Sequence, residues 1–89
     1  MEFKFTYIPE FLKTLEKLPK KNQKQIIKKI KMVQQMSSTE IFQYIKPLVV
    51  PIDLKTHRLR VGDYRIFIRR DGDTFEFQNI DIRGSAYKK

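Results

Sequence analysis

Two basic blocks hold the residues of this chain whose types and spacing could do chemistry. The first block runs from His57 to Phe67 and the second from Arg83 to Lys88. An arginine guanidinium stays charged at neutral pH and binds phosphate oxygens through a two-pronged fork. A tyrosine such as Tyr87 adds a flat ring on which a nucleic-acid base can stack. Clustered cations with a nearby aromatic ring are therefore suited to holding an RNA backbone and one base.

The reaction that such a set could support is cleavage of RNA by its own 2′-hydroxyl. That reaction needs a base for the hydroxyl proton, charge near the phosphorane oxygens and an acid for the leaving oxygen. Arginine suits the second task, but using it as a base at pH 7 costs roughly 7 kcal/mol, and using tyrosine costs roughly 4 kcal/mol. Histidine moves protons readily near neutral pH, yet His57 falls on the opposite face of its predicted strand from Arg58. We therefore expect catalysis to rest on geometry and electrostatics.

Alternation along two predicted strands, His57–Val61 and Tyr64–Arg70, sorts these charges by face. Neighbouring side chains of a strand point to opposite faces of the sheet. One face collects apolar residues that should pack under helices, namely Leu59, Val61, Ile66 and Ile68. The other collects the cations Arg58, Arg60, Arg65 and Arg69. Arginines that alternate with aliphatic residues are also typical of a solvated outer face, so the alternation alone leaves both interpretations open.

The elements that must position these strands come first in the chain. Phe3, Phe5 and Tyr7 alternate with polar residues, which predicts a short, half-buried strand. One helix is expected from Pro9 to about Leu18 and a second from Pro19 to Met36, joined as a hairpin. The second helix has apolar residues at three- and four-residue steps, namely Ile26, Ile27, Ile30, Val33 and Met36.

Lysines cover the other faces of the second predicted helix. They are Lys20, Lys21, Lys24, Lys28, Lys29 and Lys31. A run of this kind is usually a solvated face, and an electrostatic docking surface for RNA or an acidic partner is the alternative.

The second half of the chain predicts a meander of strands. A loop and possible cap at residues 37–39 precede an expected helical turn over residues 40–46, and Pro47 and Pro51 bracket an irregular connection. Turns are expected at residues 62–63 and 71–73, followed by a third strand, Thr74–Ile82. The predicted fold class is α+β: an N-terminal strand, a helix hairpin, then an antiparallel three- to four-stranded meander. One domain should span residues 1–89.

Composition narrows the classes of partner. Nineteen lysines and arginines against ten acids give a net charge of +9, which attracts polyanions such as nucleic acid, anionic lipid or an acidic protein. The absence of cysteine and the single histidine argue against a metal site, and we expect no cofactor. No uncharged run approaches the roughly 18 residues of a membrane span. The N-terminus lacks a signal-peptide pattern, so a cytoplasmic location is expected.

At the block from Arg58 to Arg65, reading Arg-Leu-Arg-Val-Gly-Asp-Tyr-Arg, the sequence resembles the RelE/ParE toxin superfamily. The resemblance also takes in the early strand, the helix hairpin with its Leu18-Pro19 joint and the ending Arg83-x-x-x-Tyr87-Lys88. It implies a RelE-like fold and a toxin of a toxin–antitoxin pair, with a cognate antitoxin as partner. RelE-type members cut mRNA on the ribosome, whereas ParE-type members act on DNA gyrase.

The resemblance also assigns roles to individual residues. It implies catalytic roles for Arg58, Arg65, Arg83 and Tyr87. RNA-binding roles are expected for Lys55, Arg60, Arg69 and Lys88. The Arg83 and Tyr87 ending favours the RelE side. Many relatives carry a histidine where this chain has Ile82, and no glutamate matches the general base of some branches. A gyrase-directed toxin and a non-catalytic module that binds RNA or antitoxin therefore stay as alternatives.

Overall fold

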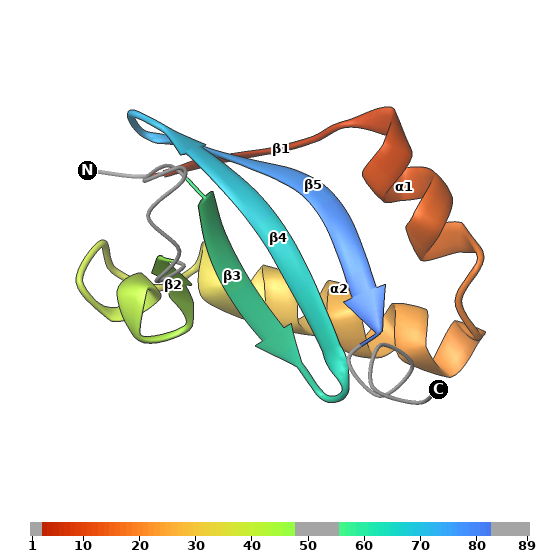
Figure 1. Ribbon diagram of the computed structural model, residues 1–89. Helices are drawn as coiled ribbons and strands as arrows, with labels where there is room; N and C mark the ends of the chain where they lie inside the picture. The colour runs from red at the N-terminus through yellow and green to blue at the C-terminus, as the bar shows by residue number, and fades with distance from the viewer. Residues whose placement is uncertain (1–2, 48–55, 83–89) are drawn as a thin grey trace.

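The computed structural model describes residues 3–47 and 56–82, which form one sheet and two α-helices (Figure 1). The elements in chain order are β1 (Lys4–Tyr7), α1 (Pro9–Glu16), α2 (Lys20–Gln34), the 3₁₀ helix η1 (Glu40–Gln43), β2 (Ile45–Pro47), β3 (Thr56–Val61), β4 (Tyr64–Asp71) and β5 (Thr74–Ile82). This order confirms the predicted α+β class.

The sheet has the strand order β1-β5-β4-β3-β2. Strands β2 to β5 form the antiparallel meander that the sequence predicts. Strand β1 joins the edge beside β5, and it runs parallel to β5, with Lys4 opposite Thr74. The sheet is therefore mixed: β1 runs parallel to β5, and the other neighbouring strands run antiparallel. The two helices connect β1, at one edge of the sheet, to β2 at the other edge.

Two glycines make the tight turns of the meander possible. Gly62 and Gly72 have φ angles of 59° and 62°, a region that residues with a Cβ adopt at a cost of about 1–2 kcal/mol. Each begins a two-residue connection, between β3 and β4 and between β4 and β5. The registers that follow place Val61 opposite Tyr64 and Asp71 opposite Thr74. Both turns fall where the sequence predicts them.

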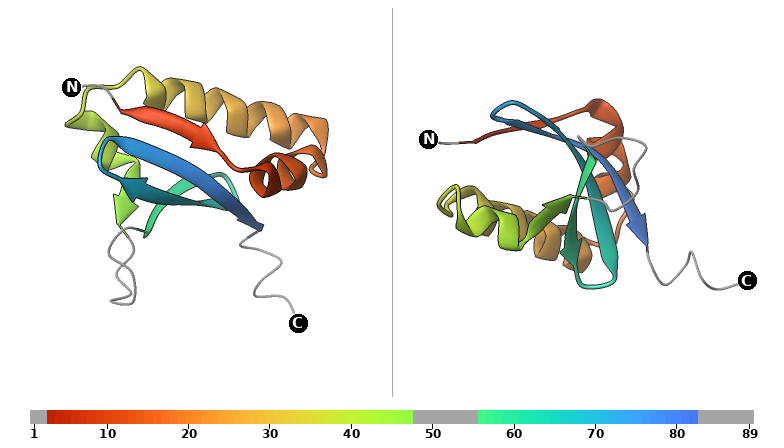
Figure 2. Two further views of the ribbon diagram at one scale, coloured as in Figure 1. Left: turned by 90° about the horizontal axis from the view of Figure 1, so that it is seen from above. Right: turned by 60° about the vertical axis from the view of Figure 1, so that its left-hand side comes forward.

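Both helices lie on one face of the sheet, as Figure 2 shows from two directions. The apolar sides of the strands and helices meet there. The core includes Phe11, Ile26, Ile30, Val33, Leu59, Val61, Ile66, Ile68, Phe75 and Phe77. The four apolar strand residues predicted to lie under the helices are all buried. None of the helices in the two described ranges is long and apolar enough to cross a membrane.

A hydrogen bond from Asn22 of α2 to the hydroxyl of Tyr64 joins the helix hairpin to β4. Tyr64 is buried, so this bond satisfies a polar group that would otherwise be costly to bury.

One member of the expected apolar stripe of α2 does not reach the core. Ile27 keeps 39% of its surface exposed, and Leu12 of α1 keeps 45%. The stripe of α2 is therefore wider than the surface that the sheet covers.

The segment after α2 differs from the prediction at one point. Ser37 and Glu40 form a reciprocal cap: the Glu40 amide donates to Ser37 Oγ at 3.2 Å, and Glu40 Oε1 accepts from the Ser37 amide and hydroxyl. The expected helical turn ends at Gln43, however, and Ile45–Pro47 forms the edge strand β2. Pairing with β3 outweighs the local preference, because it buries Ile45 completely.

Candidate nucleic-acid interface

The face of the sheet turned away from the helices carries a field of cations. Arg58 and Arg60 come from β3, Arg65 and Arg69 from β4, and Lys46 from β2. Arg58 and Arg65 are half-buried, and the other three are exposed. The structure therefore confirms the face that strand alternation predicts for all four arginines, and it adds Lys46. We call this surface the arginine face.

Like charges lie directly opposite each other on the arginine face. The register sets Arg60 against Arg65 and Lys46 against Arg58. Such pairs destabilise a sheet, because side chains directly opposite have Cβ atoms only about 5 Å apart. Lys46, Arg58 and Arg60 have no carboxylate of the described residues within ion-pair distance. An arrangement that costs stability in this way is expected where function requires it.

Arg65 is the most firmly held cation of the arginine face. Its Nη2 donates to Oδ2 of Asp81 at 2.8 Å, and its guanidinium lies 5.8 Å from the ring centroid of Phe67. Its Nε is buried and has no hydrogen-bond partner among the described residues. An unpaired buried donor costs about 1–3 kcal/mol. Asp81 and Phe67 thus orient the guanidinium, although its Nε has no acceptor among the described residues.

A bulge in β5 brings Asp81 to this position. Ile68 pairs with Phe77 but Phe67 pairs with Asn79, so Gln78 is an extra residue in the ladder. Strict alternation from the buried Phe77 would put Asp81 on the core side. The extra residue reverses the alternation, as expected for a bulge. Sequence reasoning therefore missed Asp81.

Acids gather at the β5 side of the arginine face and not at the β2 side. Asp81 lies opposite Arg65, and Glu76 lies opposite Arg69. Glu76 also accepts a hydrogen bond from Gln78 at 3.0 Å. Compensation of the positive charge therefore decreases from β5 towards β2, and an anion meets the least opposition near Arg58 and Arg60.

Phe67 is an aromatic residue of the arginine face that the expected site omitted. It lies between Arg58 on β3 and Asn79 on β5 and is half-buried. Strand alternation puts Phe67 on the same face of β4 as Arg65, two residues away, and this was the signal that could have found it. A ring flanked by guanidinium groups offers a surface on which a base can stack.

Two other side chains of the meander lie outside the arginine face. His57 is 5% exposed on the core side, near the rings of Phe42 and Phe75, which agrees with the face of the strand predicted for it. The guanidinium of Arg70 lies 5.3 Å from the ring of Phe3 and 5.0 Å from that of Phe42. Neither group reaches the arginine face.

Four residues of the expected site, Lys55, Arg83, Tyr87 and Lys88, lie outside the described residues. The structure therefore brings together Arg58, Arg60, Arg65 and Arg69 of the expected set. Within residues 3–47 and 56–82, no three His, Cys, Asp or Glu side chains come together as a metal-ion site.

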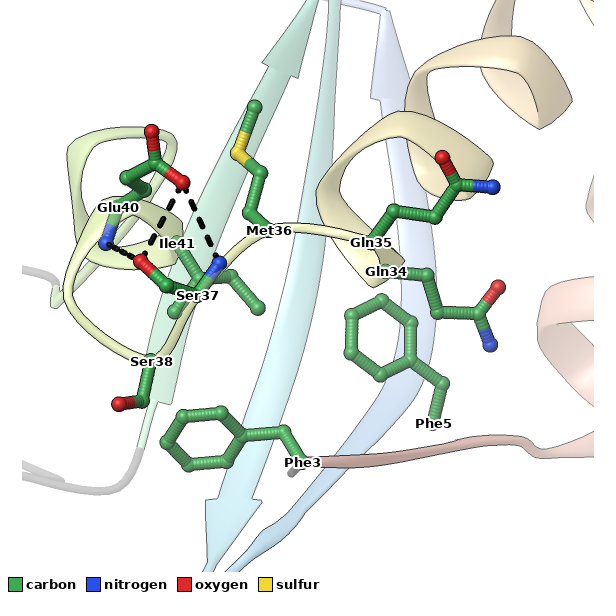
Figure 3. Close-up of a pocket in the computed structure, with 9 residues that line it drawn as sticks. All are labelled: Phe3, Phe5, Gln34, Gln35, Met36, Ser37, Ser38, Glu40 and Ile41. Atoms are coloured by element: carbon green, nitrogen blue, oxygen red, sulfur yellow. Dashed lines mark hydrogen bonds between the residues drawn. The ribbon is translucent and has the colours of Figure 1, made fainter. Parts of the chain in front are cut away.

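Four cavities border the described residues, and one of them, of about 340 Å³, lies between α2 and the turn after β3, where Met32 and Gly62 are among its lining. Figure 3 shows another of about 810 Å³ between Phe3 and Phe5, the end of α2 and the Ser37–Glu40 cap. An apolar groove of about 280 Å³ lies between α1 and α2, with Tyr7, Leu12, Leu15, Ile27 and Ile30 among its lining. The remaining cavity, of about 250 Å³, is lined by Lys29, Gln43, Tyr44, Lys46, Arg58 and Arg60. Among these cavities of the described part of the chain, the one lined by Arg58 and Arg60 touches the arginine face.

No protein-family model and no curated protein matches this sequence. Solved structures match it by fold. A chain of the RelB–RelE antitoxin–toxin complex from Methanococcus jannaschii is 28% identical with a TM-score of 0.69, over 92% of this chain and 94% of that chain.

Two further complexes contain a similar chain. In the archaeal RelE–RelB complex from Pyrococcus horikoshii it is 20% identical with a TM-score of 0.70, over 94% of this chain and 98% of the other. In the toxin–antitoxin complex RelBE2 from Mycobacterium tuberculosis it is 23% identical with a TM-score of 0.66, over 93% and 100%. The last two likenesses concern the fold alone.

Proposed function

We propose that this chain is a RelE-type toxin of a toxin–antitoxin system, which its 28% identity to a chain of the Methanococcus jannaschii RelB–RelE complex supports, and that it is a ribosome-dependent endoribonuclease that cleaves mRNA. It acts in the cytoplasm, on messages presented in the decoding site. The RNA's own 2′-hydroxyl is the cleaving nucleophile and the cations of the arginine face supply charge at the phosphate, so the proposed reaction needs no metal ion or cofactor.

The observation that carries this proposal is the uncompensated charge of the arginine face. Arg60 faces Arg65 and Lys46 faces Arg58, and the acids lie one strand or more away, on β5. An RNA phosphate placed among these cations would relieve their repulsion. A purely solvated outer face gains nothing from this arrangement, so the pairing of like charges favours the functional interpretation.

In the proposed reaction, Arg58 and Arg65 stabilise the charge that grows on the phosphate oxygens. Arg65 is oriented by Asp81 at 2.8 Å before RNA binds. Donors that are held in position before the reaction stabilise the charge of a transition state, and removing one such donor costs roughly 2.7–4 kcal/mol.

Proton transfer is assigned to Arg83 and Tyr87. This rests on the family resemblance of the ending Arg83-x-x-x-Tyr87-Lys88. His57 is excluded as the base by its burial on the core side. With an arginine and a tyrosine as the acid–base pair, the enzyme is slow on free RNA, and the ribosome supplies the orientation of the message. Arg60, Arg69, Lys55 and Lys88 hold the flanking backbone.

A cognate antitoxin is the proposed protein partner. The apolar groove between α1 and α2 exposes Leu12 and Ile27, and Tyr7 keeps 36% of its surface exposed beside them. Lys31 lines the same groove. An antitoxin segment with apolar and acidic residues fits this combination. We propose that it continues onto the arginine face, so that the complex buries more than about 1,200 Å² in total.

The test is induction of the protein in growing cells, followed by mapping of mRNA 5′ ends on translated and untranslated messages. The expected result is codon-phased cleavage confined to translated messages, which disappears when the antitoxin is co-expressed. A DNA-damage response with intact mRNA would instead support a gyrase-directed toxin. Normal growth with intact mRNA would support a binding module without catalysis.

A further inference from the structure

The cavity of about 250 Å³ beside β2 is surrounded by cations from three separate elements. Lys29 comes from α2, Lys46 from β2, and Arg58 and Arg60 from β3; Tyr44 and Gln43 complete the lining. No carboxylate is among these lining residues. We call this cavity the β2 pocket.

The geometry of the β2 pocket keeps its cations close together. Lys46 and Arg58 are directly opposite in the ladder, and Arg58 and Arg60 share one face of β3 at a spacing of roughly 6.6 Å. Lys29 approaches from the helix layer, and its Nζ lies 5.0 Å from the centroid of the Tyr44 ring. Lys29 is also the half-buried member of the lysine run of α2, whereas the others are exposed. Lys29 is therefore the lysine of α2 that lines this pocket, and it also borders the neighbouring cavity that Lys28 and Met32 line.

We propose that the β2 pocket binds one nucleotide of single-stranded RNA beside the nucleotides held on the arginine face. Lys29 and Lys46 would contact its phosphate, and Tyr44 would stack against its base. This proposal rests on the proposed function, because Arg58 and Arg60 line the β2 pocket and also belong to the arginine face.

Size and chemistry favour a nucleotide over an acidic peptide. The pocket, of about 250 Å³, holds no more than one nucleotide, because it is smaller than the roughly 300–1,000 Å³ of most small-molecule sites. Tyr44 keeps 37% of its surface exposed, so it presents an aromatic surface next to four cations. Cations that follow a backbone, together with a ring that takes a base, form the usual arrangement for single-stranded RNA.

The test is binding of a fluorescent single-stranded RNA hexamer to the full-length protein over a range of salt concentrations. The RNA is 2′-O-methylated, so that it cannot be cleaved. The variant Lys29→Gln is compared with Lys31→Gln, which removes the same charge two residues further along α2. Lys31 lines the apolar groove instead. Lys29→Gln should lower the magnitude of the log–log salt slope by about 0.7, and Lys31→Gln should leave the slope unchanged.

Tyr44 provides a second readout that does not depend on charge. Tyr44→Leu should weaken RNA binding by about tenfold, whereas Tyr44→Phe, which keeps a ring, should bind like the wild type. Equal slopes for the two lysine variants, or equal affinities for Tyr44→Leu and the wild type, would overturn the proposal. So would a loss of antitoxin binding in Lys29→Gln with RNA binding intact, because the pocket would then hold an acidic protein segment.

These outcomes separate the pocket from the proposed function. Binding of the methylated hexamer requires no cleavage. If the wild type does not cut translated mRNA but Lys29→Gln still lowers the magnitude of the salt slope, the proposal for the β2 pocket is supported and the endoribonuclease proposal fails. If the wild type cuts mRNA and Lys29→Gln behaves like Lys31→Gln, only the pocket fails.

Discussion

Arg65 and Asp81 form an ion pair across β4 and β5, with Nη2 and Oδ2 2.8 Å apart. Their side chains are 23% and 39% exposed, so the pair itself contributes only about 0.2–1 kcal/mol to stability. Its importance lies in orientation. Asp81 offsets the repulsion between Arg65 and the facing Arg60, and it holds one guanidinium of the arginine face in a defined position.

Removing the charge of Asp81 should separate RNA binding from cleavage. Asp81→Asn should raise RNA affinity at low salt by about two- to fivefold, because the variant loses a negative charge that weakly repels the RNA phosphates. Cleavage on ribosomes should fall, because Arg65 is no longer oriented. The control is Glu76→Gln, which removes the same charge from the same strand beside Arg69. Equal effects of the two variants on cleavage would show that only net charge matters.

The arginines of the sheet should each account for part of the salt dependence of RNA binding. Arg58→Gln, Arg60→Gln and Arg65→Gln should each reduce the magnitude of the log–log slope by about 0.7 on single-stranded RNA, if each loses one phosphate contact. Lys21→Gln, an exposed position of α2, should leave the slope unchanged. Unchanged slopes in the three arginine variants, together with a reduced slope in Lys21→Gln, would place the RNA on the exposed lysines of α2.

Arg83→Ala should abolish mRNA cleavage and growth arrest without changing the melting temperature. Tyr87→Phe and Tyr87→Ala distinguish two roles of the phenol. A stacking role is retained by phenylalanine, whereas proton transfer is lost in both variants. Cleavage by purified ribosomes is the measurement. Growth arrest by Arg83→Ala at wild-type expression would contradict the assignment of Arg83.

The apolar groove should matter for the antitoxin and not for the RNA. Leu12→Glu or Ile27→Glu should weaken antitoxin binding by about tenfold or more, which corresponds to about 1.4 kcal/mol, because a carboxylate would enter an apolar contact. Both positions are exposed, so the fold and the mRNA cleavage should persist. Met32→Glu is the matched control, since Met32 is 38% exposed on α2 but lines a different cavity. A similar loss in Met32→Glu would argue against the groove.

Tyr7 should make stability sensitive to alkaline pH. Burial raises the pKa of the Tyr7 phenol above its ordinary value of about 10. The phenol of the unfolded chain therefore ionises first, so the free energy of unfolding falls as the pH rises from about 10 through the folded pKa. In Tyr7→Phe this fall should be less steep, measured by urea unfolding between about pH 9 and 11. Equal slopes for the two proteins would contradict this role of Tyr7.

The sequence alone determined the face on which the sheet arginines lie. The two-residue period of β3 and β4 places Leu59 and Ile66 under the helices, so Arg58 and Arg65 must point the other way. The glycine turns keep these strands in one register. Burial of an apolar face and the geometry of a short turn are local constraints, and local constraints can be inferred from the order of residues.

Other parts of the site depend on contacts between elements that are distant in the chain. The bulge at Gln78 sends Asp81 to Arg65, and it becomes visible only when β4 and β5 are paired. Whether an apolar helix residue is buried depends on how far the sheet extends, so Ile27 remains exposed at the groove despite its place in the stripe. Lys29 meets Tyr44 because α2 and the η1 segment pack together. Alternation and periodicity describe one element at a time, whereas these positions are set by the register and packing of several.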